Sequence, residues 1–92
     1  MRSEEIVSEI FEGIEKEMAK GYTRLYVNVD DQDNGNGELR VLAMKGPEDM
    51  IVFEGVFQLA TCREVLALLE QSEYNIKDFT SALWSDGGNE RL

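Results

Sequence analysis

Residues 23–45 read TRLYVNVDDQDNGNGELRVLAMK, and this stretch decides the fold. Apolar and polar side chains alternate over residues 23–29, which is the pattern of a β-strand with one buried face. Residues 30–38 are polar and contain two Asn-Gly pairs, the dipeptide most favoured in tight hairpin turns. A second strand is expected over residues 39–45. The expected inward side chains are those of Thr23, Leu25, Val27 and Val29 on the first strand and Leu39, Val41 and Ala43 on the second.

The segments on either side of this hairpin are expected to form a third strand and a helix. Residues 46–49, Gly-Pro-Glu-Asp, are expected to form a turn, and residues 50–57 a third strand. Upstream, residues 3–20 carry apolar side chains at steps of three and four, which predicts an amphipathic helix. Ser3 is its expected N-cap, and Gly21 is expected to end it in a left-handed conformation.

Two helices are expected after the strands. Thr61 and Glu64 have the spacing of a capping box, so the first of these helices is predicted over residues 61–71. A shorter helix is predicted over residues 76–85, with Asn75 as its N-cap.

These elements amount to a single α+β domain over residues 1–92. Its predicted order is a helix, a three-stranded antiparallel β-meander and two helices, α-β-β-β-α-α. Residues 89–92 are expected to fray. Because 42% of the residues are apolar, the chain has enough side chains for one core and does not resemble a disordered acidic tail.

The chain carries 19 Asp and Glu against 9 Lys and Arg, a formal net charge of −10. This charge opposes direct binding to nucleic acid and to anionic membranes. The single cysteine, Cys62, has no partner for a disulfide within the chain and favours a reducing compartment. The first residues lack a basic-then-apolar signal segment. We therefore expect a cytoplasmic protein that binds neither nucleic acid nor membrane directly.

Catalytic chemistry has little support in the sequence. The chain has no His, which removes Ser-His-Asp and Cys-His pairs and imidazole metal ligands. Cys62 is expected at the first residue of a helix, where its pKa would fall, but no base is available to it. A calcium loop read from Asp30 would have Val41 where the twelfth ligand, a bidentate Glu, belongs. We expect no enzyme activity, no cofactor and no dedicated metal site.

The carboxylates are expected in three surface clusters, spread out because the two turns of a meander lie at opposite ends of the sheet. Glutamates four residues apart on a helix lie about 6 Å from each other, close to the separation of successive phosphates along a nucleic-acid strand. An ordinary solvated surface is the alternative. The predicted partner-binding residues are Glu5, Glu9 and Glu12 on the first helix, Asp30, Asp31, Asp33 and Glu38 at the first turn, and Glu48 and Asp49 at the second. The predicted remainder of the helix's solvent face is Glu4, Glu15 and Glu17.

A sheet covered by helices on one side only would expose apolar side chains on the other. Leu42 and Met44 are expected to point away from the core, beside Tyr26 of the first strand. With Tyr22 they form a candidate apolar interface for a homodimer or another protein partner. The alternative is that Trp84 or the C-terminal segment covers them.

In charge, size and order of elements the chain resembles small acidic phage-encoded inhibitors that mimic DNA, of the anti-restriction and anti-CRISPR type. At least one anti-CRISPR family has the same helix, three-strand, helix layout. The resemblance implies a non-enzymatic inhibitor that occupies the nucleic-acid groove of a basic partner, such as a restriction or CRISPR nuclease.

Two other functions stay open. One is an immunity or antitoxin protein that covers a basic toxin, where the same electrostatics give fast association. The other is an acidic secretion chaperone. Type III secretion chaperones are similar in their first helix, three strands and helix, and in the run Val27-Asn28-Val29-Asp30 before a glycine turn. They continue with two further strands and another helix.

Overall fold

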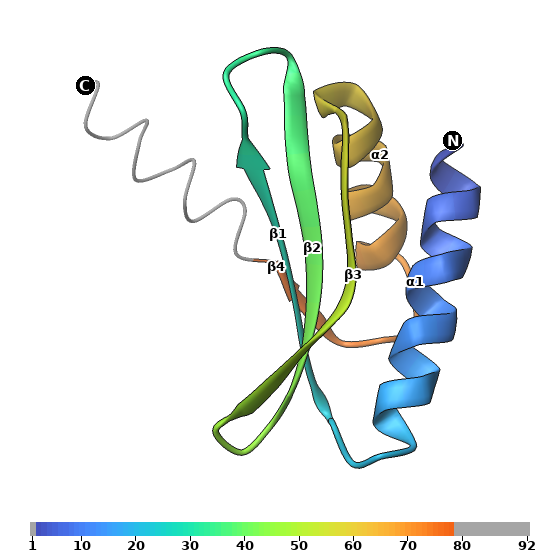
Figure 1. The fold of residues 1–92 in the computed structure, drawn as a ribbon. Coiled ribbons are helices and arrows are strands. Elements are labelled where there is room, and N and C mark those ends of the chain that lie inside the picture. The colour runs from blue at the N-terminus through green and yellow to red at the C-terminus, as the bar shows by residue number, and fades with distance from the viewer. Residues whose placement is uncertain (1, 79–92) are drawn as a thin grey trace.

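The computed structural model describes residues 2–78 of the chain (Figure 1). The elements are α1 (Ser3–Met18), β1 (Arg24–Asp31), β2 (Asn36–Lys45), β3 (Glu48–Gln58), α2 (Leu59–Glu70) and β4 (Ile76–Asp78). The strands form one sheet in the order β3-β2-β1-β4, in which β4 is parallel to β1 and the other pairs are antiparallel. Both helices lie on the same face of this sheet (Figure 1). The predicted α+β class and the antiparallel meander are confirmed.

The hydrophobic core lies between the helices and the inward face of the sheet. Every second side chain through most of β1 and β2 is buried, as the alternation of residues 23–45 predicts. The predicted inward residues are confirmed except for Thr23, which precedes β1 and is exposed. The core includes Ile6, Ile10 and Ile14 of α1, Leu25, Val27 and Val29 of β1, Leu39, Val41 and Ala43 of β2, and Cys62, Val65 and Leu69 of α2.

The two ends of α1 are set by backbone contacts. Ser3, predicted as the N-cap, is instead the first helical residue, and its side chain is buried. The backbone amides of Glu5 and Ile6 donate to the carbonyl of Arg2, and the amide of Arg2 donates to Glu5 Oε1 at 3.3 Å. Arg2 is therefore the N-cap. After the helix, Gly21 has a φ of 97°, which confirms the predicted left-handed conformation.

A glycine brings α1 close to the edge strand β3. The pairing of β2 with β3 shifts by one residue between Val41 and Leu42, which leaves Val52 without a partner in β2. A Cβ added at Gly13 would lie 2.6 Å from Val52 Cγ1 and 3.1 Å from the Val52 carbonyl oxygen. The glycine and the bulge together therefore fix how closely the helix approaches the strand.

Both hairpin turns are shorter than predicted, because the strands extend into them. Residues 32–35 connect β1 to β2, and residues 46–47 connect β2 to β3. Asp33, Gly35 and Gly46 have positive φ angles of 63°, 86° and 60°, a region that Asp and Gly accept more readily than most residues. Only the first of the two Asn-Gly pairs lies in a turn.

The second Asn-Gly pair places Gly37 inside β2, facing the core. A Cβ at this position would lie 2.7 Å from Val29 Cγ1 and 3.0 Å from Leu59 Cδ2. The start of α2 therefore rests directly on Gly37, and the amide of Leu59 donates to the carbonyl of Gly35 at 3.1 Å. The capping box predicted at Thr61 is wrong, because α2 begins at Leu59 and Thr61 lies within the helix.

The largest difference from the prediction follows α2. Residues 76–78 form a strand instead of the start of a helix, and Ile76 pairs with Leu25 of β1. The apolar spacing favours a helix locally, but β1 would otherwise present an unpaired edge, and the tertiary pairing prevails. The sheet therefore has four strands in place of three. Residues 79–92, with the rest of the predicted helix and the predicted frayed end, lie outside the described residues.

Candidate interaction surfaces

Three aspartates of the first turn are exposed around a short loop. Asp31 Oδ1 accepts the backbone amide of Asp33 at 2.8 Å, and Asp30 accepts the Gln32 side-chain amide at its carbonyl and its carboxylate. None of the three forms an ion pair with a Lys or Arg of residues 2–78. The hydrogen bonds shape the loop and leave its negative charge without a cation.

Glu5, Glu9 and Glu12 lie along one exposed edge of α1, and none of them forms an ion pair within the described part of the chain. Glu17, predicted on the solvent face, is instead only 6% exposed and lies 3.2 Å from Lys20 Nζ. The helical period explains its burial, because Glu17 follows the buried Ile14 by three residues. The role of the three exposed glutamates in binding stays a prediction.

Glu38 differs from the aspartates of the first turn, because it is paired. Its carboxylate lies 2.9 Å from Arg40 Nη2, and Arg40 Nε lies 3.5 Å from Glu54. One cation therefore serves two carboxylates on the sheet, and Glu38 contributes less to an acidic surface than the prediction assumes.

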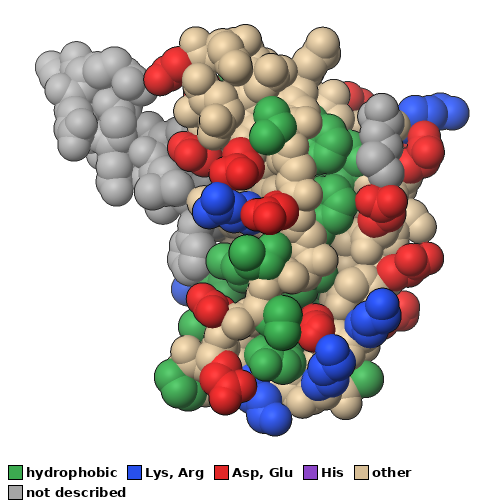
Figure 2. All heavy atoms as spheres, viewed as in Figure 1, with side chains coloured by type: hydrophobic (Ala, Val, Ile, Leu, Met, Phe, Trp, Pro, Cys, Tyr) green, Lys and Arg blue, Asp and Glu red, His purple; other side chains and the backbone are tan. Residues whose placement is uncertain are grey.

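Several basic side chains gather at the opposite end of the molecule, near the bottom of the view in Figure 2. Lys45 Nζ donates to the carbonyl of Lys20 at 3.3 Å, and Arg24 Nη2 donates to a carbonyl of the β2–β3 turn at 2.7 Å. Glu48 and Asp49, the predicted third cluster, lie at this end too, and the Tyr22 hydroxyl donates to Glu48 Oε2 at 3.4 Å. The basic residues here are Lys16, Lys20, Arg24 and Lys45.

The outer face, meaning the side of the sheet away from α1 and α2, carries half-buried apolar side chains. Tyr26 and Leu42 pair across β1 and β2, and Met44 lies on the same face, as predicted. Tyr22 is different, because it precedes β1 and packs against the core. Ile51, 51% exposed and paired with Leu42, was not predicted, because the bulge in β3 hides its orientation from a simple alternation.

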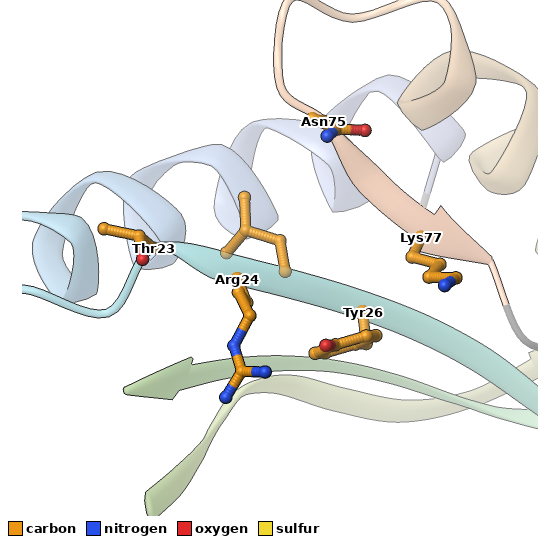
Figure 3. A pocket seen from close by; sticks show the side chains of 6 residues that line it. Thr23, Arg24, Tyr26, Asn75 and Lys77 are labelled. Carbon is orange, nitrogen blue, oxygen red and sulfur yellow. The ribbon is translucent and has the colours of Figure 1, made fainter. Parts of the chain in front are cut away.

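A hollow of about 390 Å³ opens beside Tyr26, at the edge where β4 joins β1 (Figure 3). Arg24, Tyr26 and Lys77 extend from the side of the sheet away from α1. The sequence prediction missed Lys77 because it assigned this segment to a helix. The residues lining the hollow are Thr23, Arg24, Leu25, Tyr26, Asn75 and Lys77.

The thiol of Cys62 faces the core. Cys62 lies inside α2, fully buried, with Sγ 3.6 Å from the carbonyl oxygen of Gly37 and 3.8 Å from that of Phe57. Burial raises the pKa of the Cys62 thiol, and this effect exceeds the opposite effects of its hydrogen bonds and of Arg63. The predicted position at a helix start with a lowered pKa is therefore wrong.

The raised pKa of Cys62 predicts a loss of stability in alkali. Above pH 9.0, the ordinary pKa of the thiol, the unfolded chain releases this proton while the folded chain keeps it. Raising the pH then favours the unfolded state. We expect the free energy of unfolding, measured in urea at pH 8 and pH 10, to fall more for the native chain than for Cys62→Ala. Lys and Tyr titrate in both proteins, so only the difference between the two proteins reports on Cys62. An equal fall in the free energy of unfolding for both would contradict the raised pKa of the thiol.

Comparisons with known proteins identify no relative: no family model, no curated protein and no solved structure matches the chain. Within residues 2–78 no helix is long and apolar enough to cross a membrane. The same residues contain no group of three or more Asp, Glu and Cys side chains placed to hold a metal ion.

Proposed function

We propose that this protein is a non-enzymatic cytoplasmic inhibitor that binds a basic, nucleic-acid-binding enzyme, such as a restriction or CRISPR nuclease, as a mimic of DNA. The observation that carries the proposal is a set of exposed carboxylates without ion-pair partners in residues 2–78. Those on the edge of α1 and at the first hairpin turn, called the acidic surface below, are Glu5, Glu9, Glu12, Asp30, Asp31 and Asp33.

The arrangement of the acidic surface supports such a role. Glu5 lies in the first turn of α1, and that end of the helix lies at the same end of the molecule as the first hairpin turn (Figure 1). Successive glutamates on the helix edge are about 6 Å apart, a spacing that suits a groove built for phosphates. Lys16, Lys20, Arg24 and Lys45 lie at the opposite end, away from this surface.

The proposal is tested with purified restriction and CRISPR nucleases and a DNA substrate. We expect the protein to inhibit cleavage by at least one of these enzymes and excess DNA to restore it, because both would compete for one groove. Neutralising the helix edge with Glu5→Gln, Glu9→Gln and Glu12→Gln should slow association at least about tenfold at low salt. Stopped-flow binding at several salt concentrations measures this effect.

A matched variant removes the same number of charges elsewhere. Glu48→Gln, Glu70→Gln and Glu73→Gln change exposed carboxylates at the start of β3 and on and after α2 and should alter association less. Binding that is unaffected by salt, or by competing DNA, would count against mimicry. If the protein inhibits a basic ribonuclease toxin and none of the DNA nucleases, its role is that of an immunity or antitoxin protein.

One observation favours the secretion-chaperone alternative. A strand follows α2 in this chain, as it does in the layout of those chaperones, although the prediction placed a helix there. A chaperone would bind an extended apolar segment, so its affinity would persist at high salt. The salt dependence measured above therefore separates the two functions.

A further inference from the structure

Strand β3 forms one edge of the sheet. Among the described strands it pairs only with β2, so the backbone amide and carbonyl of every second residue point away from the sheet. At the bulge, the Val52 carbonyl lies against Gly13 of α1. Beyond the bulge, residues 53–56 pair regularly with β2. Their outward backbone groups are the part of this edge that is open to an added strand.

The side chains of β3 do little to protect this edge. Edge strands that stay unpaired commonly carry a lysine, a proline or a bulge. Strand β3 has no Lys, Arg or Pro, and its bulge precedes residues 53–56. Met50, Ile51 and Val56 of β3 are 40%, 51% and 56% exposed, and within the described part of the chain Met18 is the one other large apolar side chain so exposed. Exposed apolar groups gathered on one strand are typical of a binding surface.

Helix α1 places carboxylates beside the open part of the edge. Gly13 lies against Val52, and α1 runs in the opposite direction to β3 (Figure 1), so residues before Gly13 lie beside residues after Val52. Glu9 precedes Gly13 by one turn on the same side of the helix, and Glu5 precedes Glu9 by another turn. Both glutamates are exposed, and neither forms an ion pair within residues 2–78.

The cations of the neighbouring elements leave this negative charge in place. Arg40 of β2 is already engaged, because it lies 3.5 Å from Glu54 and closer still to Glu38. The other cations of α1 and β2 lie toward or beyond the two ends of the edge, and they are Arg2, Lys16 and Lys45. Two copies joined edge to edge would set their acidic helix edges against each other, so charge opposes a second copy here and favours a basic strand.

We infer that residues 53–56 bind an extended segment of another protein as a fifth strand, and that this segment carries Lys or Arg at alternate positions. Main-chain hydrogen bonds join it to β3, and its side chains alternate between the two faces of the sheet. On the helix side, Lys or Arg stems pack beside the half-buried, stacked rings of Phe53 and Phe57, and their charged ends point toward Glu9. On the outer face, apolar side chains contact Val56.

This inference goes beyond the proposed function, although both use Glu5 and Glu9. Mimicry of DNA needs the charges alone, whereas an added strand also needs the open backbone of β3. Binding of a peptide and inhibition of a nuclease are separate measurements, so the failure of one is distinguishable from the failure of the other.

Synthetic peptides of about eight alternating Lys and Val residues test the inference on the full chain by fluorescence anisotropy. We expect this peptide to bind and a peptide of alternating Glu and Val not to bind. N-methylation of every backbone amide keeps the charge and removes every donor, so it should weaken binding at least about tenfold. Hydrogen exchange measured by NMR locates the site, because the outward amides of residues 53–56 should exchange at least about tenfold more slowly with the peptide bound.

Two charge reversals on α1 form a matched pair. Glu9→Lys should weaken binding of the Lys-Val peptide at least about tenfold. Glu15→Lys makes the same change in net charge one turn after Phe11, on the side of α1 that faces Tyr74, and should weaken binding at most about twofold. Circular dichroism confirms that both variants are folded.

Three results would overturn the inference. The first is a native chain that binds no Lys-Val peptide at about 1 mM. The second is equal affinity for the N-methylated peptide, which would show that charge alone holds it. The third is protection of residues 53–56 without peptide in a chain that sediments as a dimer, which would assign the edge to a second copy.

Discussion

Replacing Gly37 with valine is expected to lower the free energy of unfolding by about 3 kcal/mol or more, because the position has no room for a side chain. A Cβ there would already lie 2.7 Å from Val29 Cγ1, 3.0 Å from Leu59 Cδ2 and 3.4 Å from Cys62 Sγ. Valine adds two methyl groups to that crowding, so either α2 moves off the sheet or β2 bends. Urea denaturation followed by circular dichroism measures the loss.

Gly35 provides the matched control in the neighbouring Asn-Gly pair. Gly35→Ala places a Cβ in open space, at a φ of 86°, and should cost about 1 kcal/mol through the backbone alone. If Gly37→Val were no more damaging than Gly35→Ala, the start of α2 would not rest on β2 as described.

Truncating Leu39 to alanine is expected to lower the free energy of unfolding by about 2 to 5 kcal/mol. Its side chain is fully buried between the sheet and the helices, so the change removes apolar contacts and leaves a cavity. Thermal and urea denaturation measure the effect.

Leu42 is the control for this second prediction, because it lies on the same strand with its side chain on the outer face. Half-buried and outside the core cluster, it should lose only about 1 kcal/mol on truncation to alanine. Equal losses for Leu39→Ala and Leu42→Ala would mean that both faces of the sheet are equally buried in the monomer.

The parts of the fold that the sequence predicts are those where local pattern and tertiary structure agree. Alternation in β1 and β2 identifies the buried face, because each inward position is apolar over several residues. The two adjacent Asn-Gly pairs are the same local signal for a turn. Gly37 nevertheless belongs to a strand, because the start of α2 packs directly against it. Residues 76–78 are too few to show a period of their own, and the open edge of β1 determines their structure.

The sequence likewise predicts only part of the candidate surfaces. The helical period places Glu5, Glu9 and Glu12 on an exposed edge, and the same period applied to Glu17 would have shown that it faces inward. Ile51 could not be oriented from the sequence, because the bulge beside it reverses the alternation.

The separation of charge along the molecule has a consequence for how it meets a partner. Glu5 and the three aspartates of the first hairpin turn lie at the end where both helices begin, and Lys16, Lys20 and Lys45 lie toward the other end. A body charged in this way has an electric dipole moment in addition to its net charge. In the field of a basic surface it is turned during approach, so that encounters occur with the acidic end leading. Productive orientation would then be selected in solution, before any side chain makes contact.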